Sequence, residues 1–466
     1  MAAPPPFYTG VVRSLPAPVS KIALGLLACL LLGGVIAAVR DKPGELPIYM
    51  RAAERLWAEQ SIYDPADDPA FSYPPAFALV TLPLVPLNDD CRRAAWWGLN
   101  LALLGGVLLA VWAAVRPALL GDGNAGADGK ESDDRTTRRR LWGWGGLTTV
   151  LAGRFVLSPL AYQSHDLILL ALMTAAAVCW TRRRNGLAGT AAGLAAAFKA
   201  TPLLAAAFFL LRRRRSSLLA MALTIPAATF AADALSSNPD RGPWVKTWAE
   251  RFVLPVAPGT APDVENAWER WNPLNQSLAG TIARLTSDPS TDRLERGGAV
   301  VTVRRLPAET AQQITLAAAG LVLLWLAWCA WRPREQDRPA APFQDAAAPP
   351  GGLTAGLRCL SELALTLGGM LLLSPMSSTQ HFVFLLPGIA VIAARLVLRP
   401  RDLLNDLAAV GLFALGTLPA KDLIGDELSE VIRSAGGYTA CTLIVLLACG
   451  RLLWKDRRAR RGSPLP

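Results

Sequence analysis

The sequence predicts an all-α polytopic membrane protein, a bundle of about 12 transmembrane helices with extracytoplasmic interfacial helices beside it. Of its 466 residues, 52% are hydrophobic and only 18% are charged. Apolar runs of about 20 residues recur along the chain, and a helix of about that length crosses the hydrocarbon core of a bilayer. We expect helices because an open strand cannot satisfy its backbone hydrogen bonds in lipid.

Short basic clusters at the ends of the apolar runs indicate the topology. They read TRRRLW at 137–142, RRRN at 182–185, RRRR at 212–215 and KDRRARR at 455–461. Cytoplasmic loops carry an excess of Lys and Arg, so these clusters are expected inside. They account for the net charge of +11 as membrane anchoring. We therefore expect no nucleic-acid partner.

The chain divides into five parts with both ends in the cytoplasm. These are a cytoplasmic N-terminus (1–21), an N-terminal membrane module (22–235) with an outer loop at 40–92, a large extracytoplasmic loop (236–310), C-terminal membrane helices (311–454) and a cytoplasmic tail (455–466). The expected spans are 22–39, 94–115, 142–159, 164–181, a hairpin at 186–211, 216–235, 311–331, 359–375, 381–397, 404–419 and 436–454. The inner loops 116–141 and 332–358 have the composition of disordered linkers, so function is expected on the outer side.

Two apolar segments are too short or too interrupted to be ordinary spans. Residues 73–87 (YPPAFALVTLPLVPL) contain four prolines, and counting them as a span would put the triple arginine of 138–140 outside. We expect an interfacial helix paired with the amphipathic segment before it. In the hairpin, each arm of about 12 residues spans only about 18 Å, so the turn at Lys199 to Pro202 should lie within the membrane thickness.

Few residues in this chain could carry chemistry. The two histidines, His165 and His381, both fall at the outer mouths of expected spans. Glu45 follows the first span and could act as a general base toward a hydroxyl, or be a solvated anion at a helix start. Asp41 and Asp64 are weaker candidates. His165 could equally cap a helix or donate one structural hydrogen bond.

Lys199 and two amides complete the candidates. A lysine in an apolar hairpin is costly unless it meets water, a counter-ion or a ligand, so Lys199 could neutralise a phosphate or pair with Asp166, with snorkelling as the alternative. Asn275 and Gln276 could hydrogen-bond a sugar or cap the following helix. The chain has no CxxC, DxD or Walker motif, so no metal site and no nucleotide loop are expected.

Several motifs, in their order, resemble one family. They are ELPIYMRAAERL (45–56), IYDP (62–65), FSYPPAFAL (71–79), AGLAAAFKATPLL (192–204), NQSLAG (275–280) and LLSPMSSTQHFVFLLP (372–387). Together the motifs resemble glycosyltransferase family 87, a GT-C family of polyprenyl-phosphate-sugar transferases, over about residues 20–400. The sequence departs from that pattern in two places. Glu45 stands where the family usually has Asp, and Ser378 to Gln380 replace aromatic and acidic residues.

The resemblance implies a GT-C-like bundle and a metal-independent, inverting hexosyltransferase. Its donor would be a polyprenyl-phosphate-sugar, with mannose as the sugar, and its acceptor a lipid or glycan; no cofactor would be needed. Glu45 would deprotonate the acceptor, while Lys199 and His381 would hold the leaving phosphate. The remaining implied substrate contacts are Tyr49, Arg51, Tyr73, Gln163, His165, Asp166, Asn275 and Gln276.

The resemblance also implies a multi-pass protein of the plasma (inner) membrane, with membrane lipids around it and its active site on the extracytoplasmic side. The membrane half of the cavity would take the polyprenyl tail. A transporter or lipid flippase is the alternative, because transporters also place short interrupted helices at binding sites. Against it, the chain has no inverted repeat, and its polar residues gather at one face. A non-catalytic scaffold is a third possibility, suggested by Glu45 in place of Asp.

Overall fold

The computed structural model describes residues 44–120, 130–239, 242–288, 301–331, 352–398 and 402–462. Within these residues every assigned element is a helix, and the only extended pairing is an isolated bridge between Val264 and Trp268. Six helical segments of the described chain are long and apolar enough to cross a membrane: α4 (Asp89–Leu120), α9 (Arg215–Leu235), α13 (Ala308–Ala330), α14 (Ala355–Leu373), η6 with α15 (Thr379–Leu385 and Leu386–Leu398), and α19 (Gly437–Gly462). The prediction of an all-α polytopic membrane protein is confirmed.

The remaining expected spans coincide with shorter or more polar helices. These are α5 (Lys130–Ala161), α6 (Asp166–Thr181), α7 (Asn185–Phe198), α8 (Leu204–Leu211) and α16 (Leu403–Leu412), which continues as a π-helical turn, η7 (Phe413–Thr417). The expected first span, 22–39, lies outside the described residues, as does most of the inner loop 332–358. The total of about 12 crossings therefore stays a prediction. The expectation of a disordered linker at 116–141 is wrong in part, because α4 runs to Leu120 and α5 begins at Lys130.

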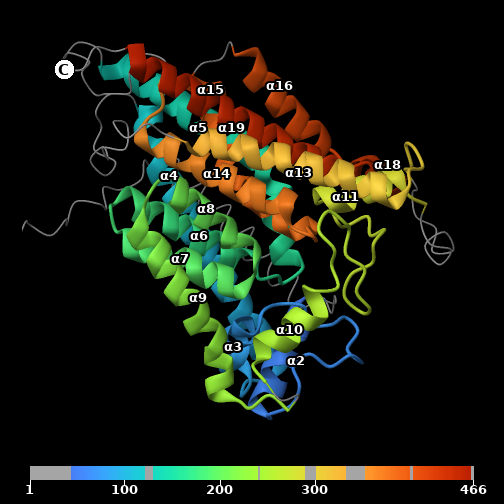
Figure 1. Ribbon diagram of the computed structural model, residues 1–466. Coiled ribbons are helices and arrows are strands. Elements are labelled where there is room, and N and C mark those ends of the chain that lie inside the picture. Colours follow the sequence, from blue (N-terminus) through green and yellow to red (C-terminus); the bar gives the residue numbers. More distant parts are fainter. Residues whose placement is uncertain are drawn as a thin grey trace, which may run out of the picture.

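The helices that carry the site pack in two groups that meet along α14 (Figure 1). Helices α14 and α15 are the most buried of the long apolar helices, whereas α9 and α13 turn most of their surface outward. Helix α7 lies directly against α9 through two glycines one turn apart. A Cβ at Gly189 would collide with the backbone of Ser217, and one at Gly193 would lie 2.8 Å from Thr224 Cβ. Small residues at this spacing let membrane helices approach closely.

A second, smaller core forms a cap at one end of the bundle, where α2, α3 and α10 gather (Figure 1). Helix α2 (Leu46–Trp57) buries one face, with Leu46, Tyr49, Met50, Ala53 and Leu56 at helical spacing. The predicted interfacial helix at 73–87 is broken into η1 (Pro75–Phe77), α3 (Ala78–Thr81) and η2 (Leu82–Leu84). It packs on α2 as expected. Its interruption follows from proline, which cannot donate to the helical ladder.

The described part of the loop 236–310 contains helices α10 and α11. Helix α10 (Trp244–Phe252) completes the cap core, and α11 (Leu278–Thr286) packs on α13. The short helices α17 (Lys421–Ile424) and α18 (Asp426–Ser434) connect η7 to α19. Helices α10 and α11, together with the hairpin turn between α7 and α8, contribute to the lining of the cavity described next.

Candidate active site

A cavity of about 520 Å³ lies where the cap meets the membrane helices. Its walls come from the loop before η1, the hairpin turn after α7, the segment 253–260, α13, and the end of α14 with the chain that follows it. Most of the lining is apolar. Among the lining side chains that the structure describes, four can gain or lose a proton: Glu45, Tyr73, Lys199 and His381. All four are among the residues predicted from the sequence.

Glu45 is held at the edge of this cavity by three side-chain donors. The hydroxyls of Tyr49 and Tyr73 both donate to Oε2, the second over 3.3 Å, and the amide of Gln380 donates to Oε1. The Glu45 backbone N–H donates to the carbonyl oxygen of Tyr162 at 2.8 Å. The carboxylate therefore has a fixed orientation, while 18% of the side chain stays exposed.

Burial and neighbouring groups set the protonation states of Tyr49, Tyr73 and Glu45. Burial raises the pKa of Tyr49 and of Tyr73 well above the ordinary range, and the charge of Glu45 raises both further, so both remain neutral donors. Burial alone would raise the pKa of Glu45. The hydrogen bond and charge of His165, the Tyr49 hydroxyl and the charge of Lys199 outweigh it, and the pKa of Glu45 is lowered. Glu45 is therefore an anion at neutral pH.

His165 lies behind this carboxylate and does not line the cavity. Its Nδ1 is 2.9 Å from the Tyr49 hydroxyl, and its ring lies edge-on to Tyr73 and Phe77. Since Tyr49 donates to Glu45, the His165 nitrogen must donate to the Tyr49 oxygen. His165 precedes α6 but makes no side-chain cap. A helix cap and a structural hydrogen bond were the two structural roles expected for His165, and the hydrogen bond is the one observed.

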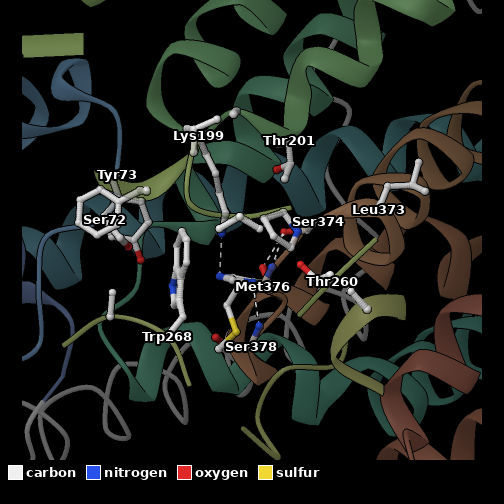
Figure 2. Close-up of a pocket in the computed structure, with 18 of the residues that line it drawn as sticks. Ser72, Tyr73, Lys199, Thr201, Thr260, Trp268, Leu373, Ser374, Met376 and Ser378 are labelled. Carbon is white, nitrogen blue, oxygen red and sulfur yellow. Dashed lines mark hydrogen bonds between the residues drawn. The ribbon is translucent and has the colours of Figure 1, made fainter. Parts of the chain in front are cut away.

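Lys199 and His381 meet in the lining of the same cavity. Helix α7 ends at Phe198, so Lys199 adopts an extended backbone and reaches from the hairpin turn toward the middle of the cavity, beside Trp268 (Figure 2). Its Nζ lies 2.8 Å from His381 Nε2. The predicted turn at Lys199 to Pro202 is confirmed, and the two histidine rings are 6.2 Å apart, as their common level in the sequence suggested.

The tautomer of His381 follows from its second nitrogen. Nδ1 accepts a hydrogen bond from the backbone N–H of Ser378 at 2.9 Å, so the ring proton of a neutral His381 is on Nε2. Two N–H donors, on Lys199 and His381, thus face each other. Asp166 Oδ1 is buried, has no hydrogen-bond partner in the described part of the chain, and lies 3.6 Å from His381 Nε2. The arrangement offers two donors to an anion entering from the cavity.

Comparison with known proteins assigns this constellation to a family. The model of glycosyltransferase family 87 matches residues 71–348, more than half of the chain. The chain belongs to glycosyltransferase family 87. No curated protein and no solved structure matches the chain significantly.

Family membership makes the protein a membrane glycosyltransferase and favours that activity over the transporter or flippase alternative. The matched segment contains Tyr73, His165 and Lys199 but neither Glu45 nor His381. In this family 87 protein, folding brings those two outlying residues into the same cavity as Tyr73 and Lys199.

Arg51 and Gln163, both predicted to contact substrate, lie away from the cavity. The Arg51 guanidinium donates to the Pro69 carbonyl at 2.5 Å and pairs with Asp67 at 3.3 Å, so it fixes the loop before η1. Gln163 has a left-handed backbone with φ of 51°, and its carbonyl accepts from Trp96 at 2.8 Å. Arg51 thus braces the loop of the glycosyltransferase that carries Tyr73, and Gln163 joins the turn before α6 to α4.

Asn275 and Gln276 were expected to bind a sugar or to cap a helix, and the structure shows a third role. Both are fully buried and lie outside the cavity lining. Asn275 donates to the Pro375 carbonyl at 2.9 Å and accepts from the backbone N–H groups of Ser277 and Ser377, each at 3.1 Å. Helix α11 is capped instead by Ser277.

Together with Asn275, Gln276 forms a network of buried hydrogen bonds, which we call the latch. Its amide nitrogen donates to the carbonyls of Pro273 and Arg433 at 2.9 and 2.7 Å, and its backbone N–H donates to Ser377 at 2.8 Å. The Asn275 side chain and the Gln276 backbone therefore hold the chain between α14 and η6, which delivers Gln380 and His381 to the site. The Gln276 side chain ties this segment to α18 at Arg433. No substrate contact is open to the two amides in this arrangement.

Replacing Asn275 with Ala is expected to destabilise the protein without removing any group from the cavity. The backbone N–H groups of Ser277 and Ser377 would lose their partner, and each buried unsatisfied group costs roughly 1–3 kcal/mol. The Pro375 carbonyl would keep only the Ser277 hydroxyl. Thermal unfolding of the purified protein in detergent measures this. Asn238→Ala is the matched control, since half-buried Asn238 donates to Thr247 at 3.0 Å outside the latch. Equal melting temperatures for the two variants would contradict the latch.

Three residues at the site were not found from the sequence. Gln380 touches Glu45, and Trp248 and Trp268 form part of the cavity wall. The position of Gln380 beside His381 was noted only as a departure from the family pattern. Residues 236–310 are rich in tryptophan (Trp244, Trp248, Trp268 and Trp271), and this composition does not indicate which rings face a cavity.

Proposed function

We propose that this family 87 enzyme is an inverting hexosyltransferase that moves mannose from a polyprenyl monophosphate to a hydroxyl of a lipid or glycan acceptor. Transfer would take place on the extracytoplasmic face, without a metal ion. One observation carries the proposal: an ionised Glu45 and the Lys199–His381 pair line one and the same cavity. A base and an anion site facing one space are what displacement at a sugar phosphate requires.

The reaction follows from these positions. The acceptor oxygen bonds to the anomeric carbon as its proton passes to Glu45. The bond from that carbon to the phosphate oxygen breaks, and the phosphate leaves with the electron pair. Lys199 and His381 Nε2 donate to the oxygen on which negative charge develops, which stabilises the transition state. Attack on the face opposite the leaving group inverts the anomeric centre.

The Lys199–His381 contact supports an anion at this position. Two N–H donors 2.8 Å apart repel unless an acceptor satisfies them. A phosphate oxygen entering from the cavity would accept from both. Asp166, with its unpartnered Oδ1 behind His381, balances part of the positive charge in the free enzyme.

The hydrocarbon tail of the donor has an apolar path to follow. A second cavity of about 210 Å³ lies between α8, α13 and α14. Along α13 and α14 it lies one to two turns from the first cavity, and α8 follows the hairpin turn that lines the first cavity. Its lining is apolar apart from Glu362 and Thr366, and Glu362 is paired with Arg212 at 2.6 Å. Between the two cavities lies Gly369, where an added Cβ would come 2.6–2.7 Å from Leu326 and Leu204.

Replacing Gly369 with Val is expected to raise KM about tenfold for a long-tailed donor, since each buried CH₂ contributes about 0.8 kcal/mol and 1.36 kcal/mol is tenfold. A donor with a tail of two isoprene units, too short to pass Gly369, should be used as before. Gly320→Val on α13 is the control, because nothing lies within 4 Å of a Cβ there. An equal loss with both donors would contradict the tail path.

The acceptor would enter from the outer side, where Trp248, Trp268 and Phe252 line the wall. Broad apolar rings with hydroxyls nearby, such as Ser72 and Thr260, suit a sugar ring or a lipid headgroup. Lys199 is the only lysine or arginine among the described lining residues, so this part of the pocket favours one phosphate, that of the donor.

The test is sugar transfer in membranes that express the protein, with radiolabelled polyprenyl-phosphate-mannose as donor and the host lipids as acceptors. We expect label in lipid or glycan products, undiminished by a chelator. Transfer only from a nucleotide-linked sugar would overturn the donor assignment. Transfer abolished by chelation and restored by a divalent cation would overturn the metal-independent mechanism.

A further inference from the structure

One contact at the site joins its two halves. The Glu45 carboxylate receives Tyr49 and Tyr73 on Oε2, both from the cap, but Oε1 receives only Gln380 among the described side chains. Gln380 is buried and belongs to η6, 335 positions away in the sequence. The next residue is His381, which contacts Lys199. Gln380 is thus the side chain through which the anion site touches the base.

The orientation of the Gln380 amide is set on its other side. The hydroxyl of Thr379 donates to Gln380 Oε1 at 3.4 Å, which leaves the amide nitrogen to face Glu45. This matters because an ionised carboxylate only accepts hydrogen bonds, so only the nitrogen end of the amide can hold it. The latch at Asn275 and Gln276 fixes the chain that leads into η6. Each step places the donor on Oε1.

We propose that Gln380 is a positioning residue that aims the Glu45 carboxylate at the acceptor hydroxyl. The proposal rests on the proposed function, in which Glu45 is the base. Two hydroxyls on one oxygen leave a carboxylate free to swing about that oxygen, and a third donor on the other oxygen fixes its plane. Alignment of reacting atoms is sensitive, since a displacement of about 1 Å can cost about 10²-fold in rate.

Two variants separate aiming from mere packing. Gln380→Ala removes the donor, and we expect kcat to fall about 10- to 100-fold with KM for the donor nearly unchanged. Gln313→Ala makes the same deletion at an exposed position on α13 and should match the wild type. If Gln380→Ala kept the wild-type kcat, or changed only KM, the positioning role would be lost.

Gln380→Glu adds a signature in pH. In acid the new carboxyl shares a proton with Glu45 and donates its O–H as the amide does; in base both are ionised and repel. The groups facing this pair are Tyr49 and Tyr73, which stay neutral, His165 and Lys199, which favour its ionisation, and Asp166, which opposes it. We expect kcat relative to wild type to fall at least about tenfold from about pH 5 to about pH 8. A ratio that is flat in pH would overturn the proposal.

A second measurement needs no substrate and separates failure of this inference from failure of the proposed function. If the wild type transfers no sugar from the lipid-linked donor, the donor assignment is wrong, but thermal unfolding still reports the contact. The melting temperature of Gln380→Glu should fall further below that of the wild type as the pH rises from about 5 to about 8. A constant difference would show that position 380 does not sense the charge of Glu45.

Discussion

Glu45→Gln is expected to lower sugar transfer by about 10²- to 10⁴-fold at an equal level of protein, the range that one general base contributes. The amide has the size of the carboxylate, so Tyr49, Tyr73 and Gln380 still surround it, but it cannot accept the proton of the acceptor. Transfer from radiolabelled polyprenyl-phosphate-mannose in membranes measures the effect. Glu54→Gln is the matched control: it lies on the same helix and faces Arg92 at 2.7 Å instead of the cavity.

Transfer that does not depend on Glu45 would leave the enzyme in place and move the base to another group.

The ionised state of Glu45 leads to a second prediction, on the pH dependence of kcat/KM. Because its pKa is lowered below the ordinary 4.5, the base form persists from neutral pH down to that value. We expect kcat/KM to stay flat over this interval and to fall only below it, as protonation of Glu45 removes the base. An acid limb well above pH 4.5 would contradict the hydrogen-bonded arrangement.

Charge in an apolar setting was the signal that the sequence carried best. Lys199 in an alanine-rich hairpin and Glu45 after an apolar run are costly placements, and both side chains line the cavity. The two histidines were expected at one level, and their rings lie 6.2 Å apart. The membrane bundle followed from apolar length in the same way, because length and charge are properties that a segment has before it packs.

Amide and guanidinium side chains could not be assigned, because their partners depend on which backbone passes nearby. Asn275 binds the Pro375 carbonyl, 100 residues away, where a sugar was expected. Arg51 likewise binds the loop at Pro69. Gln380 was overlooked for the converse reason: nothing local distinguishes a glutamine that meets a carboxylate 335 positions distant. Such contacts are decided by packing between distant segments.

Lys199→Met is expected to lower kcat/KM for the lipid-linked donor about 10- to 100-fold, since hydrogen bonds to charged groups contribute about 1.5–3 kcal/mol and 1.36 kcal/mol is tenfold. The methionine keeps the length and the apolar stem of the lysine but offers no donor to the phosphate. Transfer kinetics over a range of donor concentrations measure the change. Lys246→Met serves as control, because Lys246 is exposed on α10 and pairs only loosely with Glu250 at 3.8 Å.

The same variant distinguishes an anion site from a structural cation. If Lys199 served mainly to neutralise Asp166, its removal would leave a buried carboxylate without a nearby ammonium, and the chief result would be a lower melting temperature. If it holds the donor phosphate, Lys199→Met should insert and fold, bind polyprenyl phosphate more weakly than the wild type, and lose more in the transition state than in binding, because the charge on the departing oxygen is greatest there. Unchanged affinity for polyprenyl phosphate, with unchanged kcat, would remove Lys199 from the site and leave His381 to hold the phosphate.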